Sequence, residues 1–178
     1  MAIIIMEMIG KKHNNQFYPT FSGVAQSYNY YPVSHMDRKE GIGFVALGLG
    51  KTIADGKKSL RFSPHYPEIL SQYYSPDTML ENSQNIFYAL DLNEGANPMK
   101  DGEANNLSLY DLNKAEEDGE LKHIASVLDI NDHVLRDSLQ YSGPRVITFS
   151  GLLKHKRIEL HEILKFFLEY GESALGCP

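Results

Sequence analysis

The sequence predicts an α+β fold, a mainly antiparallel sheet with a few flanking helices. Short apolar runs bounded by Gly or Asn recur along the chain, as at 43–47 and 86–92, and such runs are typical of strands. Residues 107–112, LSLYDL, alternate apolar and polar side chains, which is the period of a half-buried strand. Residues 158–168 instead carry apolar side chains at 160, 163, 164, 167 and 168, which is helical spacing.

The chain opens with a predicted strand at 2–9, AIIIMEMI, whose apolar and β-branched residues favour burial on both faces. Further strands are predicted at 17–29, 43–47, 59–62, 86–92, 107–112, 124–128 and 144–150. Helices or helical turns are predicted at 52–56, 113–119, 133–139 and 158–168, with Gly171 interrupting or ending the last. Gly, Pro and Asn predict loops at 30–40 and 93–106, and three prolines, Pro64, Pro67 and Pro76, punctuate 63–80. We treat 1–178 as part of one domain, with a β-rich half at 1–65 and a mixed α/β remainder at 66–178 that ends in a helix.

Composition excludes several classes of function. The net charge of −6 over 178 residues argues against non-specific nucleic-acid binding. Basic residues are local and form two groups, Lys51, Lys57, Lys58 and Arg61, and Lys154, His155, Lys156 and Arg157. No apolar run reaches the length of about 18 residues that a membrane span needs. Cys177 is the single cysteine, so no internal disulfide forms, and a lone thiol fits a reducing, cytoplasmic compartment.

A glycine turn, Gly48-Leu49-Gly50-Lys51, follows the strand predicted at 43–47. Backbone N–H groups approach a phosphate most closely where no Cβ intervenes, so the turn is a candidate nucleotide contact, with Lys51 adding charge. The alternative is a plain strand-to-turn connection that requires a positive φ. The spacing of glycine and lysine is not that of a Walker A loop.

Two segments carry a resemblance to a known family. They are FSGVAQSYN at 21–29 and GFVALGLGK at 43–51. Together they resemble the nucleotide-binding domain of phosphoenolpyruvate synthase and pyruvate phosphate dikinase, which is an ATP-grasp fold. The resemblance covers most of the chain and is most specific over 20–65. It implies a partial ATP-grasp-like domain here.

The resemblance implies candidate cofactor-binding residues. Segment 3–9 matches a family strand that leads toward the adenine, which would place Glu7 and Met8 near the base. Gly48, Gly50 and Lys51 would lie near the phosphates of ATP. Two positions depart from the family pattern, because Met6 stands for the usual glutamine and Lys51 for the usual glutamate after Gly-Leu-Gly. A core strand at 3–9 with methionine filling gaps is the alternative interpretation.

The family's chemistry is Mg²⁺- and ATP-dependent phosphoryl transfer to a histidine on another domain, and then to pyruvate to give phosphoenolpyruvate. The family's phosphate clamp uses a Lys and an Arg that precede this region. It also uses two strands that follow this region, one with a Glu and one with a Gln-x-Arg motif. This chain contains no Gln-x-Arg. The sequence therefore predicts a fragment, one wall of the cleft, inactive alone and completed by the other domains of a parent enzyme.

No catalytic or metal-binding residue is predicted within the chain. Its seven histidines have no histidine or cysteine neighbour at ligand spacing, and the family's carrier histidine lies in a context absent from this sequence. Two alternatives to an enzyme fragment stay open. One is a non-catalytic nucleotide-sensing module, and the other is a structural interaction module that keeps the fold without a ligand.

Overall fold

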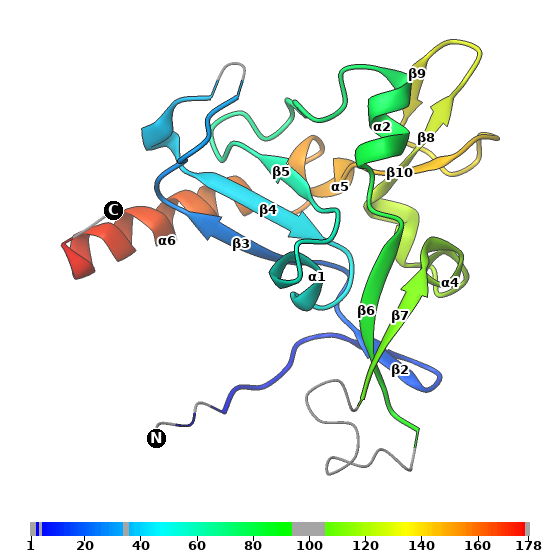
Figure 1. Cartoon of the computed structure of the whole chain (residues 1–178), viewed down its shortest axis with the longest axis horizontal. Helices are drawn as coiled ribbons and strands as arrows, with labels where there is room; N and C mark the ends of the chain where they lie inside the picture. The colour runs from blue at the N-terminus through cyan, green and yellow to red at the C-terminus, as the bar shows by residue number, and fades with distance from the viewer. Residues whose placement is uncertain (1–2, 4, 34–35, 94–105, 177–178) are drawn as a thin grey trace.

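Three antiparallel sheets make up the body of the molecule, a computed structural model that describes residues 3, 5–33, 36–93 and 106–176 (Figure 1). The first sheet, in the order β1-β2-β6-β7, consists of β1 (Lys11–His13), β2 (Gln16–Tyr18), β6 (Ile86–Asp91) and β7 (Leu107–Asp111). The second is β3 (Ser22–Gln26), β4 (Ile42–Ala46) and β5 (Leu60–Phe62). The third, in the order β10-β8-β9, is β8 (Ala125–Asp129), β9 (Val134–Arg136) and β10 (Arg145–Ile147). The predicted α+β class, mainly antiparallel with few helices, is confirmed.

Short helices connect the strands, and one longer helix follows them. The α-helices are α1 (Lys51–Ala54), α2 (Pro76–Asn82), α4 (Leu112–Glu117), α5 (Ser150–Leu153) and α6 (Leu160–Leu175), and two 3₁₀ turns are η1 (Arg38–Glu40) and η3 (Glu120–His123). Among the described residues, no helix is long and apolar enough to cross a membrane.

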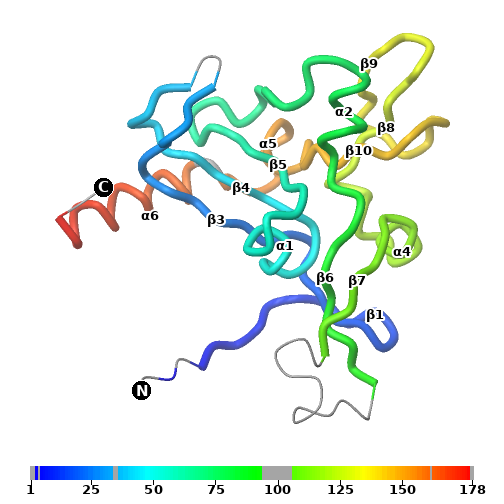
Figure 2. Tube along the Cα trace, in the orientation of Figure 1, coloured from blue at the N-terminus to red at the C-terminus, as the bar shows by residue number. Residues whose placement is uncertain are grey.

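The first sheet joins distant parts of the chain. Figure 2 shows the hairpin of β1 and β2 beside the later strands β6 and β7. In the register of this sheet, Gln16 pairs with Asp91 and Phe17 with Leu90. Strands from the segments before and after residue 65 therefore share one sheet. The stability of residues 1–65 depends on residues 66–178, and the reverse holds as well.

Two predicted elements differ from the structure because of long-range pairing. Residues 133–139, predicted as helical, instead contain β9, which pairs with β8 through a turn at His133 with φ 57°. This pairing outweighs a weak local helical preference. α6 runs through Gly171 and ends at Leu175, followed by Gly176, whose φ of 67° is that of a left-handed cap. An interior glycine costs a helix about 1 kcal/mol, and the rest of α6 outweighs that cost.

α2 was not predicted, although its start is encoded locally. Ser75 accepts from the Thr78 N–H while the Thr78 hydroxyl accepts from the Ser75 N–H, and Pro76 occupies the first turn. This is a capping box with proline at a favoured position. The three prolines between 64 and 76 punctuate this stretch, and no helix is predicted there.

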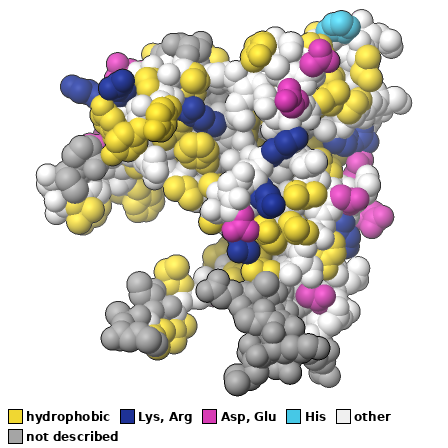
Figure 3. All heavy atoms as spheres, in the orientation of Figure 1, with side chains coloured by type: hydrophobic (Ala, Val, Ile, Leu, Met, Phe, Trp, Pro, Cys, Tyr) yellow, Lys and Arg dark blue, Asp and Glu magenta, His cyan; other side chains and the backbone are white. Residues whose placement is uncertain are grey.

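The strand predicted at 2–9 is wrong for its described part. Residues 5–10 have no strand pairing, and Ile5 and Met6 are 91% and 82% exposed. Figure 3 shows this segment standing off the body of the protein. β-branched residues favour a strand only when another strand supplies the hydrogen bonds, and none of the described strands does so here.

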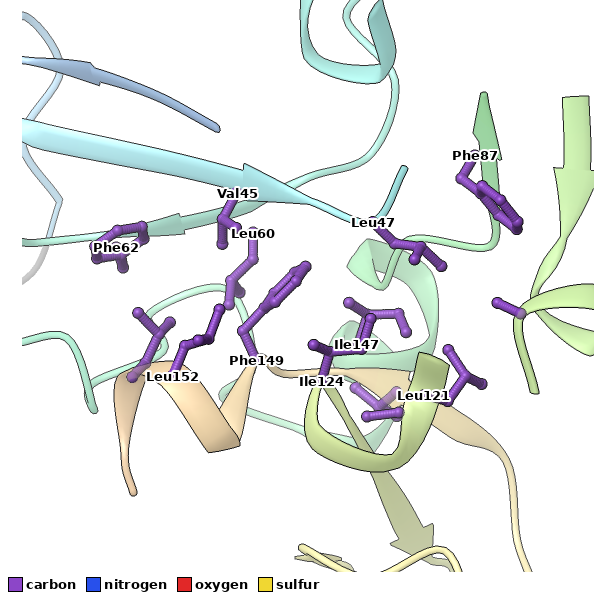
Figure 4. Packing of buried hydrophobic residues seen from close by; sticks show 14 of the residues in the cluster. Val45, Leu47, Leu60, Phe62, Phe87, Leu121, Ile124, Ile147, Phe149 and Leu152 are labelled. Carbon is purple, nitrogen blue, oxygen red and sulfur yellow. The ribbon is translucent and has the colours of Figure 1, made fainter. Parts of the chain in front are cut away.

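Hydrophobic side chains pack between the second sheet and a layer made of η3, β10 and α5 (Figure 4). Val45 and Leu60 project from the sheet, and Phe149 projects from the start of α5 between Leu60 and Ile147. Phe149 is fully buried. Burying an aromatic side chain of this size contributes about 1.5–3 kcal/mol relative to leaving it exposed, so this contact is a main determinant of how the sheets assemble.

A buried acidic pair holds the first sheet to the segment that follows it. The carboxylate of Glu120 accepts from Lys11 Nζ at 2.9 Å and from the Thr20 hydroxyl. The carboxylate of Asp118 accepts from the Tyr18 hydroxyl at 2.6 Å. Burial by itself raises the pKa of both carboxyl groups, but these donors and nearby cations more than offset it, so both pKa values lie below their usual range.

We expect the free energy of unfolding to fall as the pH drops below about 4.5, because carboxylates in unfolded chains titrate near that value. A carboxylate whose folded pKa is lowered contributes stability above its unfolded pKa and loses that contribution as the pH falls through the folded value. Urea unfolding of the wild type and Glu120→Gln across pH would measure this. The variant should be less stable at neutral pH, and the difference should shrink in acid. A difference that is independent of pH would contradict the assignment.

Candidate functional site

The predicted glycine turn lies between β4 and α1 and is fixed by other strands. Gly48 has φ 82°, and its carbonyl accepts from the Ser22 hydroxyl of β3 at 2.7 Å. The Leu49 N–H donates to the Tyr88 carbonyl of β6 at 3.0 Å. The turn therefore sits at the junction of the first and second sheets, and the predicted need for a positive φ is confirmed at Gly48.

Gln84 fixes the end of β4 that leads into this turn. Its side-chain oxygen accepts from the Leu47 N–H at 2.8 Å, and its side-chain nitrogen donates to the Leu47 carbonyl at 3.0 Å. Both residues are buried. Leaving a buried backbone group without a partner costs about 1–3 kcal/mol, so the Gln84 amide holds the end of β4 in a single position.

Gly48 and Gly50 have different surroundings. A Cβ on Gly48 would lie 2.6 Å from the Tyr88 carbonyl oxygen, whereas a Cβ on Gly50 would meet only Ser22 Oγ at 4.0 Å. Gly50 has φ −57°, which any residue adopts, and it is exposed. Gly48 is therefore required by the fold, while the absence of a side chain at Gly50 leaves an open approach to the backbone from outside.

Lys51 is held by two neighbours beside this open approach. Its Nζ lies 3.1 Å from Asp55 Oδ1 and 5.6 Å from the centre of the Tyr88 ring. The Tyr88 hydroxyl donates to Asp55 Oδ2 at 2.9 Å. Hydrogen bonds from Tyr88 and Lys51 lower the pKa of Asp55, and the Asp55 carboxylate raises the pKa of Tyr88. The Asp55 charge therefore balances part of the Lys51 charge.

The basic group predicted around this turn is divided in the structure. Lys57 is near enough to lower the pKa of Asp55 by its charge, so it adds to the field beside Lys51. Arg61 instead turns toward another loop, where its guanidinium donates to Asn29 Oδ1 at 2.9 Å and to the Tyr31 carbonyl. Lys51 and Lys57 thus lie beside Asp55 near the turn, and Arg61 belongs to the fold.

Glu7 and Met8 belong to a different segment of the structure from the glycine turn. The structure brings Gly48, Gly50 and Lys51 into one turn between β4 and α1, whereas Glu7 and Met8 lie on the exposed segment that precedes β1 (Figure 1). Both side chains are exposed. An extended segment of this kind offers apolar side chains and backbone groups to a ligand or to another surface.

The turn has the chemistry to contact an anion but not to hold a metal by itself. Backbone groups near Gly50 and the ammonium of Lys51 suit phosphate oxygens. Within the described ranges, no group of three or more His, Cys, Asp or Glu side chains could hold a metal ion. Magnesium in phosphoryl-transfer sites is held largely by the nucleotide phosphates and one or two carboxylates, and Asp55 is the carboxylate that lies beside Lys51.

Sequence reasoning identified the glycines but missed the residues that support them. Ser22, Gln84 and Tyr88 come from β3, the α2–β6 connection and β6. Ser22 lies inside the segment that resembles the family, so it could have been found there. Gln84 and Tyr88 carry no local signal, because their role depends on how β6 is placed against β4.

Comparison with protein-family models, curated proteins and solved structures found no match for this chain.

Proposed function

We propose that this chain forms one wall of the nucleotide cleft of a phosphoenolpyruvate synthase-like phosphotransferase. The domain would be part of an ATP-grasp-like unit, and the ligand that contacts the turn would be Mg²⁺-ATP. Phosphoryl transfer to a carrier histidine, and then toward pyruvate, would take place with groups from the remaining domains of the parent protein. By itself the chain would bind weakly and be catalytically inactive, and its compartment would be the cytoplasm.

The observation that carries this proposal is the contrast between Gly48 and Gly50. Hydrogen bonds to β3 and β6 fix the turn on its inner side, yet its outer side is open at Gly50. A rigid backbone turn that is accessible from outside, with a lysine at its edge, is the arrangement that phosphate groups need. The resemblance of residues 21–29 and 43–51, a pair of segments that includes the turn itself, supports the same ligand.

In this proposal each residue has a limited role. Backbone groups at Gly50 would approach phosphate oxygens, while the buried Gly48 would hold the turn in place. Lys51 would supply positive charge once its pairing with Asp55 loosens or is shared. Glu7 and Met8 would border the base after the exposed segment settles against another part of the parent protein. Since catalysis of phosphoryl transfer rests on positioning and charge stabilisation, the parent's Lys, Arg, Glu and Gln-x-Arg groups would supply the remainder.

A structural interaction module is the second candidate, and exposed apolar surface favours it. Besides Ile5 and Met6, α6 exposes Phe166, which is 62% exposed and stacks on Tyr170 with ring centres 6.3 Å apart. Large exposed apolar surfaces on soluble proteins mark interaction sites. Such surface is also expected of a cleft wall that meets other domains, so a direct test of nucleotide contact decides between the candidates.

Gly50→Val should abolish nucleotide contact at the turn and leave the fold intact. The added side chain fits the backbone conformation of Gly50 and projects into the open space that phosphate would occupy. NMR titration of the labelled wild-type chain with millimolar Mg²⁺-ATP would detect even weak binding. We expect saturable shifts of the Gly48, Gly50 and Lys51 amides in the wild type and none at these positions in the variant.

Ala54→Val is the matched control, because Ala54 is exposed near the end of α1 and the variant carries the same valine side chain away from the turn. It should behave like the wild type. If saturable binding persisted in Gly50→Val, the turn would not be part of the nucleotide site. A wild type whose turn amides do not respond to Mg²⁺-ATP would favour the interaction module.

A further inference from the structure

Among the described strands that border the three sheets, β3 differs from the others in charge. A border strand presents unpaired backbone N–H and C=O groups to any other strand, and charged side chains or proline commonly prevent such pairing. β3 reads Ser-Gly-Val-Ala-Gln, with no charged residue and no proline. The other border strands each carry charge, namely Lys11 and Lys12 in β1, Arg61 in β5, Asp111 in β7, Arg136 in β9 and Arg145 in β10.

The outer edge of β3 is also long and accessible. β3 spans five residues, and each of them pairs with β4 on the inner side, whereas β1, β5, β9 and β10 span three residues each. On its outer side β3 pairs with none of the described strands. Gly23, Val24 and Gln26 are exposed. Very short border strands offer little to a partner, so β3 is the better template for another strand.

The surface beside this edge is largely apolar, because α6 packs against β3 (Figure 1). Two hollows of about 210 and 360 Å³ lie along the joint of β3 and α6, and Ala25 lines both. Glu172 is the one charged residue in their described linings. Large side chains that line the second hollow are exposed, namely Tyr30, Phe167 and Leu175, at 66%, 62% and 78%. Exposed apolar surface of this kind marks interaction sites.

The absence of charge favours a second copy of this chain as the partner. In a two-fold symmetric dimer the same strand meets itself in antiparallel orientation, so a charge at its centre would lie opposite an identical charge, which is unfavourable. The uncharged β3 escapes this penalty, whereas the central Arg61 of β5 would incur it. β3 is therefore self-complementary in charge.

The side chains of β3 also suit this pairing. If the two-fold axis passes through Val24, the middle residue of the strand, all five residues of each copy find a partner. Val24 then lies opposite Val24 of the second copy, Gly23 opposite Ala25, and Ser22 opposite Gln26. Pairs of β-branched residues stabilise antiparallel strands, and the small side chains at 23 and 25 leave room for the second copy.

We propose that the chain forms a symmetric dimer in which the β3 strands of two copies pair edge to edge around Val24. The second sheets of the two copies join into one continuous sheet, and the apolar surface between β3 and α6 is partly covered by the second copy. The proposal does not depend on nucleotide binding at the glycine turn.

Sedimentation equilibrium of the whole chain, without nucleotide, tests the proposal. We expect a reversible dimer of twice the 20.1 kDa chain mass, with a dissociation constant in the micromolar range because the interface is small. Val24→Lys should weaken dimerisation about tenfold or more, since it places like charges opposite each other. Val134→Lys is the matched control and should dimerise like the wild type, because Val134 is 43% exposed on the border strand β9 and Val24 is 48% exposed on β3.

A charge swap at residue 24 makes the test specific for symmetric pairing. Val24→Glu alone should weaken the dimer as Val24→Lys does. An equimolar mixture of the two variants should form a dimer again, because residue 24 of one copy lies opposite residue 24 of the other and opposite charges there attract. Recovery in the mixture would also show that both variants fold.

Met6→Lys separates pairing of β3 from a contact made by the exposed segment that precedes β1. Met6 is 82% exposed and lies outside β3, so this variant should dimerise like the wild type. The proposal would be overturned by a wild type that stays monomeric, by equal losses in Val24→Lys and Val134→Lys, or by a mixture of charge-swapped variants that does not dimerise. A loss in Met6→Lys as large as that in Val24→Lys would assign the contact to the exposed segment instead.

Discussion

Gly48→Ala is expected to lower the free energy of unfolding by about 2–4 kcal/mol, from left-handed backbone strain and a displaced hydrogen bond. The backbone at Gly48 has φ 82°, which a residue with a Cβ adopts at a cost, and the added methyl group would lie 2.6 Å from the Tyr88 carbonyl oxygen. That oxygen accepts from the Leu49 N–H, so relieving the clash would move the turn away from β6. Urea unfolding followed by circular dichroism would measure the change.

Gly50→Ala, two residues away, is the matched control. Its backbone is already in a conformation that alanine favours, and its Cβ would lie in open space. We expect a change within about 1 kcal/mol, because a glycine replaced at a compatible position mainly alters the unfolded chain. Equal destabilisation by the two substitutions would contradict the placement of the turn against β6.

Phe149→Ala is expected to destabilise the protein by about 3–5 kcal/mol, the usual cost of removing a buried phenylalanine. The side chain is fully buried between Leu60 of the second sheet and Ile147 of the third. Its loss would leave a cavity at the contact between sheets, and the left-handed backbone at this position would no longer be held by packing. The same unfolding measurement reports the effect.

Phe166→Ala provides the comparison for Phe149→Ala, because the chemical change is identical and Phe166 is mostly exposed on α6. Exposed substitutions usually change stability by no more than about 0.5 kcal/mol. A large loss at Phe166 would mean that α6 is covered by another surface in solution. A small loss at Phe149 would contradict the packing of α5 against the second sheet.

The candidate site was predictable in part. The run Gly48-Leu49-Gly50-Lys51 was identified from its position after a strand, and the structure does place a turn there. Its two glycines, however, were treated as equivalent. The difference between them comes from Tyr88, which lies 40 residues from Gly48 in the sequence and reaches the turn only because β6 lies against the end of β4.

Errors in the fold had the same origin. Segment 3–9 has the composition of a buried strand, but its described residues pair with no strand and are exposed. Residues 133–139 have a composition compatible with a helix, but pairing with β8 makes a strand of 134–136. In both cases composition indicates what a segment can form, and the presence or absence of a partner strand decides what it does form.

By itself, the sequence determined the α+β class, the position of most strands, the amphipathic helix near the end and the glycine turn. These features depend on residue spacing and on glycine at a positive φ, which are local. Only the tertiary structure decided that Gly48 supports the fold while Gly50 is open, that β3 borders its sheet beside α6, and that the Ile-rich segment lies exposed. Those features depend on contacts between residues far apart in the chain, because burial and hydrogen-bond partners are set by how the sheets pack rather than by the neighbouring residues.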